Sequence, residues 1–183
     1  FNTVSMVCVT GLSVVPVSKA YNGLGQILSM FLMQTGGLGL VSLIAFSTYT
    51  LKNKLGLSDQ DLLQSALSRD NQKDLKAYLF KVYKITFSIE ALAALVIMTD
   101  FVPRFGLGHG IFNSLFLAVS AFCNAGFDVL GANSLIGYQN NLIINLVIPG
   151  LIIMGGLGFV VWFDVAHCIK KEYGKRSKFS KKH

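Results

Sequence analysis

The first residues of this chain recur, in altered form, near its middle. Residues 1–14 match residues 116–129 at a constant spacing, with phenylalanine, valine, serine, cysteine and glycine in the same order. A Gly-Gly-Leu-Gly run follows each copy, at residues 36–39 and 155–158. The repeated unit is therefore a short apolar segment, a glycine-centred turn and a glycine-rich helix. Duplication of such a unit predicts a site built between the copies about a pseudo-symmetry axis.

Composition places the chain in a lipid bilayer. Hydrophobic residues make up 52% of the sequence and charged residues 14%, which is too apolar for an ordinary soluble domain. Residues 24–51, 78–102 and 142–169 are each long enough to cross the membrane as a helix, which takes about 20 residues. The chain starts at Phe1, within an element, so we expect it to be a fragment of a longer protein.

The distribution of basic residues predicts the topology. Apart from Lys19 and Arg104, every lysine and arginine lies in residues 52–84 or 170–182. Because positive charge collects on the cytoplasmic side of membrane proteins, we expect both glycine-centred turns on the opposite side. The net charge of +7 is then a topology signal and does not indicate a nucleic-acid partner.

The two cytoplasmic segments have separate expected roles. Residues 52–76 are predicted to form a connector with an amphipathic helix, which serves either as a simple link or as a docking surface for a regulatory partner. The basic segment 170–183 is suited to anionic lipid headgroups.

The second copy of the repeat contains an apolar segment that is too short to span. Residues 111–123 give about 13 residues of helix, or ~20 Å, so we expect them to enter and leave by the outer face. The extended backbone that follows survives at membrane depth only inside protein or beside a water-filled cavity. Its carbonyl oxygens are then available to replace the hydration shell of a cation.

Two short sequences carry a specific resemblance to a known family. SMVCVTGL at residues 5–12 and SAFCNAGFD at residues 120–128 resemble the first and second selectivity-filter loops of the Trk/Ktr/HKT superfamily of potassium transporters. IMGGLGF at residues 153–159, with Trp162, resembles the helix after the second loop in bacterial Ktr-type membrane subunits.

The resemblance implies an all-α membrane protein of repeated units, each a helix, a re-entrant pore loop and a helix as in potassium channels. Four such units are arranged pseudo-fourfold around one pore in the intact protein. Residues 1–51 would hold the pore loop and following helix of repeat 1, and residues 77–169 all of repeat 2. The remaining two repeats are expected in the rest of the polypeptide.

The resemblance also implies a function and partners. It predicts potassium uptake across the plasma (inner) membrane by a multi-pass subunit, with sodium dependence as in many bacterial systems. It further implies a homodimer and a cytosolic ring of regulatory subunits, and any nucleotide is expected only on that ring. No cofactor, metal centre or catalytic residue is expected in this chain beyond the transported K⁺.

The site residues implied by the resemblance fall into two sets. Backbone carbonyls of the filter are expected to hold K⁺, and Thr10 and Asn124 are interpreted as polar residues at corresponding positions. The filter residues are Val9, Thr10, Gly11, Asn124, Ala125 and Gly126. Residues that support the filter or line its outer mouth are Leu12, Phe127, Asp128, Cys8 and Cys123, with the cysteines packed behind the filter.

Some residues have two interpretations. Asp128 either concentrates cations at the outer mouth or is a solvated loop acid. Glu90 lies inside a predicted span, and we expect it to pair with Lys81, Lys84 or a backbone group. Pro149 predicts a helix kink.

The glycine runs that follow each loop lack the flanks of a phosphate-binding loop and are expected to permit close helix packing or bending. Asp164 and His167 are interpreted as interfacial residues near the inner end of the last span.

Two rival functions are compatible with an apolar chain. An intramembrane serine hydrolase would use Ser13 with His109 or His167, but the predicted topology puts Ser13 and His167 on opposite faces. A channel for an uncharged small solute would keep the repeat and show no ion selectivity.

Overall fold

The computed structural model describes residues 1–39, 72–131, 133–158 and 161–162, and these contain helices and no strand. This confirms the all-α prediction for the described part of the chain. The helices are α1 (Asn2–Val7), α2 (Val17–Ala20), α3 (Gly23–Leu38), α6 (Gln72–Phe105), α7 (Leu107–Phe122), a 3₁₀ helix (Ile136–Tyr138) and α8 (Leu142–Gly156).

Several predictions fall outside the described residues. They concern the amphipathic connector helix, the basic segment 170–183, Asp164 and His167, and the later parts of the predicted spans 24–51 and 142–169. Pro149 lies inside α8, and the kink that it predicts stays a prediction.

Helix α6 is the longest element, and within it Phe80–Phe105 is the one helix of the described chain that is long and apolar enough to cross a membrane. Two shorter apolar helices, Leu107–Phe122 and Leu142–Gly156, correspond to α7 and α8. Helix α6 ends where Gly106 takes a φ of 79°, a left-handed conformation that glycine adopts without strain.

Helix α7 begins at Leu107, four residues earlier than the predicted short segment. The close approach of α7 to α6 requires glycine at position 110, because a Cβ there would lie 2.7 Å from Val102 Cα. The sixteen residues of α7 give ~24 Å of helix, still less than the ~30 Å hydrocarbon core.

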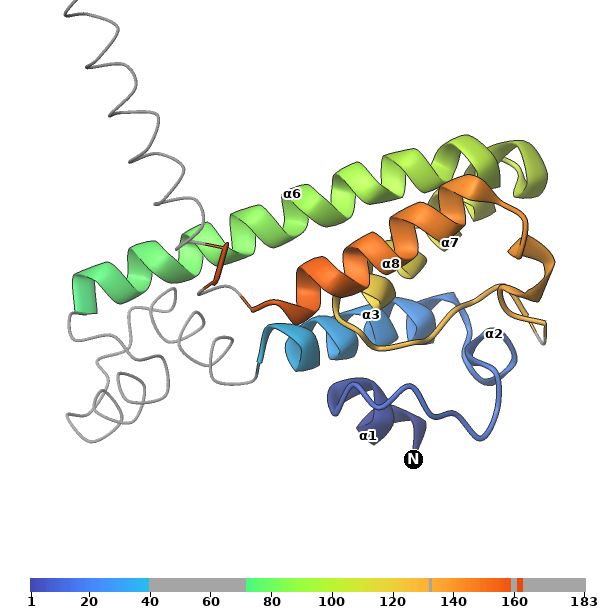
Figure 1. Ribbon diagram of the computed structural model, residues 1–183. Coiled ribbons are helices and arrows are strands. Elements are labelled where there is room, and N and C mark those ends of the chain that lie inside the picture. The colour runs from blue at the N-terminus through green and yellow to red at the C-terminus, as the bar shows by residue number, and fades with distance from the viewer. Residues whose placement is uncertain (40–71, 132, 159–160, 163–183) are drawn as a thin grey trace, which may run out of the picture.

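Figure 1 shows how the chain returns on itself. Helix α7 starts at the far end of α6 and ends partway along the bundle, and the chain then runs back to its starting side before α8 begins. Residues after α1 also run back, through α2, before α3 begins. Helices α3 and α8 therefore run in the same direction, each after its own loop.

Two apolar clusters hold these elements together, and α7 contributes to both. One joins α6, α7 and α8 around Ile97, Phe101 and Leu117. The other joins α1, α3, α7 and the segment after α7, around Met6, Met33 and Phe116. Helix α7 thus links the first copy of the repeat to the second.

Candidate functional site

The two matched segments end their short helices in the same way. Helix α1 is capped by Cys8 with φ −80° and ψ 0°, and α7 by Cys123 with φ −73° and ψ −2°. The Cys8 amide donates to Val4 O at 2.8 Å, and the Cys123 amide donates to Val119 O at 2.9 Å. We call residues 8–12 the first loop and residues 123–127 the second loop.

Both loops then alternate between left-handed and ordinary backbone angles. Val9 and Gly11 have φ of 55° and 72°, and Asn124 and Gly126 have φ of 56° and 71°. The residue between each pair has no positive φ. A non-glycine residue held in the left-handed region costs about 1–3 kcal/mol, so surrounding contacts must impose this conformation on both loops.

A serine in each helix supplies those contacts. The Ser5 carbonyl accepts from Thr10 N at 3.0 Å, and its hydroxyl accepts from Leu12 N at 3.0 Å. Ser120 does the same for Ala125 N and Phe127 N, both at 2.8 Å. Sequence reasoning gave these serines no role, although their recurrence at matched positions was the available signal.

The hydrogen bonds also set the register of the two loops. Thr10 corresponds to Ala125, and Val9 to Asn124, by both φ and amide partner. The expectation that Thr10 and Asn124 occupy corresponding positions is therefore wrong.

The carbonyl oxygens of both loops are left without hydrogen-bond donors. Within the described part of the chain, no hydrogen bond is accepted by the carbonyl of any residue in 9–11 or 124–126. Buried or partly buried carbonyls are normally paired, so two matching sets of unpaired ones are unusual. Oxygens in this state are available to an external ligand such as a cation.

The two loops meet at their glycines. A Cβ built on Gly11 would lie 3.2 Å from Ala125 O, and one built on Gly126 would lie 3.4 Å from Gly11 Cα. Residues far apart in the sequence, at the same position of the repeat, are thereby brought together.

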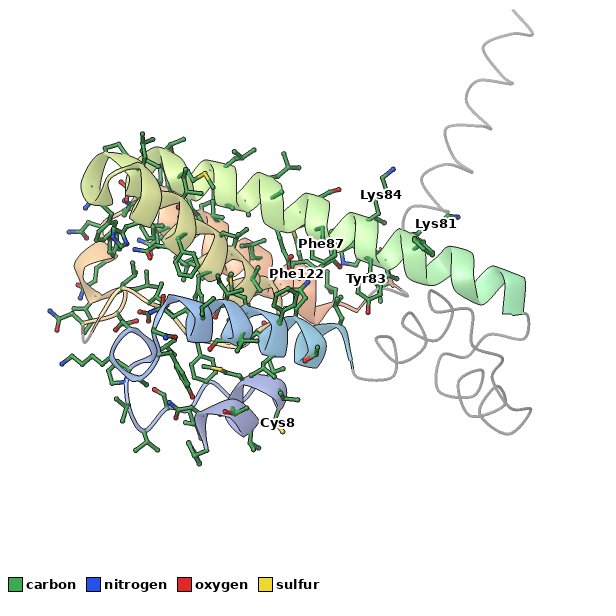
Figure 2. The ribbon with its side chains drawn as sticks, turned by 180° about the vertical axis from the view of Figure 1, so that it is seen from behind. Cys8, Lys81, Tyr83, Lys84, Phe87 and Phe122 are labelled. Atoms are coloured by element: carbon green, nitrogen blue, oxygen red, sulfur yellow. The ribbon has the colours of Figure 1, made fainter. Side chains whose placement is uncertain are left out.

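The side chains expected to support the loops differ in burial. Cys123 is buried, and its Sγ donates to Gln34 Oε1 of α3 at 3.4 Å. Phe127 is buried too, whereas Leu12 is exposed. Cys8 is also exposed, at the edge of α1 in Figure 2, so the described contacts do not pack it behind the first loop as expected.

Asp128 follows the second loop and is held by its neighbours. Its Oδ1 accepts from Leu130 N at 2.9 Å, and its Oδ2 accepts from the Ser134 hydroxyl. With Ser13 and Gly126 it lines a cavity of about 220 Å³. The carboxylate is therefore fixed beside the end of the second loop and is only partly solvated.

The predicted pairing of Glu90 with lysine is wrong. Glu90 is 2% exposed and its Oε1 has no hydrogen-bond partner. Lys81 and Lys84 are exposed, and Figure 2 shows them directed away from the other helices. The neighbour of the Glu90 carboxyl is instead the side-chain amide of Gln34 on α3.

The groups proposed for serine hydrolysis are not assembled. Ser13 lies exposed after the first loop and His109 lies exposed in the first turn of α7. No hydrogen bond joins these two side chains among the described residues, and His167 lies outside them.

Comparison with known proteins gives one consistent family. Residues 1–183 match the TrkH family, described as a cation transport protein. A potassium/sodium uptake protein, NtpJ, of Enterococcus hirae is 38% identical over 173 residues, which covers 93% of this chain and 38% of the relative. The Ktr system potassium uptake protein B of Bacillus subtilis is 39% identical over 165 residues, covering 90% of this chain and 37% of the relative. That of Vibrio alginolyticus is 37% identical over 165 residues, covering 90% and 36%. The chain thus spans less than two fifths of each relative.

Proposed function

Because this chain belongs to the TrkH family of cation transport proteins, we propose that it carries part of a potassium uptake pathway across the plasma membrane. The family and the relatives above are ion transporters and not enzymes, which removes the serine-hydrolase interpretation. The relatives are named for uptake of potassium and, in one case, of sodium as well.

The observation that carries this proposal is the pair of loops with unpaired carbonyls. Alternating left-handed and ordinary backbone angles turn successive peptide groups toward one side of a chain. Carbonyl oxygens arranged in this way can replace the water around K⁺, and discrimination against Na⁺ follows from cavity size or from ligand number and field strength. The proposed ion ligands are the carbonyls of residues 9–11 and 124–126.

Two loops form only part of such a filter. In a re-entrant arrangement, α1 and α7 enter from the outer face and the loops return to it, which agrees with the path of the chain in Figure 1. The remaining filter loops would come from two further repeats of the same polypeptide. Asp128, fixed beside the second loop, would raise the local concentration of cations at the outer mouth.

The intact protein is proposed to work in a larger assembly. Two of the relatives are named as protein B of a Ktr system, which fits a membrane subunit with separate partners. We extend this to a homodimer bound to a cytosolic regulatory ring, with any nucleotide on that ring. Sodium is either a co-transported ion or a second substrate.

The test is ion uptake by the intact protein in cells that lack their own potassium uptake, with its native partner co-expressed. Gly126→Ser should reduce the ratio of K⁺ to Na⁺ uptake, because a side chain at φ 71° distorts the carbonyl array. Gly106→Ser is the control, since Gly106 has φ 79° and open space around its Cα but lies between α6 and α7. Absence of ion uptake by well-inserted wild type, or equal selectivity of both variants and wild type, would contradict the proposal.

A further inference from the structure

The first glycine of each Gly-Gly pair lies against the end of the short helix in its own repeat. A Cβ on Gly36 would overlap the carbonyl oxygen of Val7, the last residue of α1. A Cβ on Gly155 would overlap the carbonyl oxygen of Phe122, the last residue of α7. The same contact therefore occurs in both repeats, directly before each loop.

The second glycine of the first pair lies against the other repeat. A Cβ on Gly37 would lie 2.5 Å from Cys123 Cβ, 2.6 Å from its Sγ and 2.8 Å from its Cα. One turn earlier on α3, the Gln34 side chain accepts from the Cys123 thiol. Helix α3 thus holds its own loop through Gly36 and the next loop through Gly37.

The second glycine of the second pair has no such neighbour among the described residues. A Cβ on Gly156 would meet only Asn124 Nδ2, at an ordinary contact distance of 3.7 Å, and this glycine is exposed. The position that corresponds to Gly37 is therefore open where the loop of a third repeat would follow.

From these contacts we propose that each Gly-Gly pair is a two-sided seat that positions consecutive filter loops relative to each other. The first glycine receives the last helical carbonyl before its own loop, and the second receives the loop of the following repeat. Gly36, Gly37 and Gly155 are then positioning residues for ion selectivity, and Gly156 seats the third loop of the intact protein. The inference rests on the proposed function and adds to it.

The contacts at Gly36 and Gly155 are to backbone oxygens, which cannot move aside by a change of rotamer. A methyl group at either position must displace the end of a short helix and, with it, the attached loop. A filter selects ions through the placement of its carbonyls, so this displacement alters selectivity without removing any ion ligand.

The test uses purified intact transporter in proteoliposomes, with K⁺ and Na⁺ uptake measured per inserted protein. Gly36→Ala, Gly155→Ala and Gly37→Ala should each lower the K⁺/Na⁺ uptake ratio by about tenfold, as expected when overpacking costs about one factor of ten in an equilibrium. The controls are Gly150→Ala on α8 and Gly23→Ala on α3, where nothing lies within 4 Å of the new Cβ. If the seat variants match these controls, the proposal is overturned.

Gly156→Ala tests the open half of the second seat. If the third loop packs there, this variant should lose selectivity as Gly37→Ala does. Behaviour like that of Gly150→Ala would show that the second glycine does not seat the following loop.

A size exchange separates positioning from general damage. Cys123→Gly removes the Cβ and Sγ that a methyl at position 37 would strike, so Gly37→Ala with Cys123→Gly should recover selectivity or membrane insertion relative to Gly37→Ala alone. Additive losses would contradict a direct contact. Selective wild-type uptake and a normal Gly126→Ser effect, with inert seat variants, would overturn the seat while leaving the proposed function intact.

Discussion

The first and second loops share one backbone conformation but differ in burial. Both have the same left-handed positions and the same serine hydrogen bonds. Leu12 is nevertheless 62% exposed, while Phe127 at the matching position is 4% exposed. The second loop lies in contact with both α3 and α8, whereas α3 is the helix that packs on the first. Loop conformation is therefore set within each repeat, and burial is set by the neighbouring repeats.

The largest expected effect comes from truncating the matched side chains that differ in burial. Phe127→Ala should destabilise the protein by about 3–5 kcal/mol, because a buried aromatic side chain is lost and a cavity is left. Leu12→Ala should cost about 0.5 kcal/mol or less, as at other exposed positions. Unfolding of the intact protein in detergent would measure both. Equal losses would show that the difference in burial is not kept in the intact protein.

This comparison also separates what sequence could predict from what it could not. The repeat, the helical class and a short helix before Gly126 could be predicted, because apolar segments and glycine turns are local signals. The left-handed φ of Val9 could not, since a β-branched residue disfavours that region and only the Ser5 contacts around the loop impose it. The partner of Glu90 was missed because it lies on α3, far away in the sequence.

The serines give the next largest effect. Ser120→Ala leaves the buried Phe127 amide without a partner, which should cost about 1–3 kcal/mol. Ser5→Ala should cost less, because water can reach the amide of the exposed Leu12. Hydrogen exchange at the two amides would report each loop separately. Faster exchange at Leu12 than at Phe127 in the paired variants would reverse the assignment.

A smaller effect is expected behind the second loop. Glu90→Gln should change the unfolding free energy by about 1 kcal/mol or less, in the stabilising direction, because a buried carboxyl without a charged partner is replaced by a neutral amide. Lys81→Gln and Lys84→Gln should have no effect, since both lysines are exposed. Strong destabilisation by Glu90→Gln, matched by either lysine variant, would restore the ion-pair interpretation.

The smallest effect concerns the loop exits. Asp128→Asn keeps an acceptor for Leu130 N and can donate to the Ser134 hydroxyl, so the local fold should be retained. Loss of the charge should raise the K⁺ concentration for half-maximal uptake by about twofold at low ionic strength, and this difference should vanish at high salt. Ser13→Ala, at the matching position of the first repeat, should leave uptake unchanged. A salt-independent change at Asp128 would indicate a structural role alone.

The most direct test of the ion-conducting assignment is anomalous diffraction from crystals of the intact protein soaked with Tl⁺, a K⁺ substitute. We predict anomalous peaks within coordination distance of the carbonyl oxygens of residues 9–11 and 124–126. Peaks elsewhere in the membrane region, with these carbonyls uncoordinated, would contradict the account.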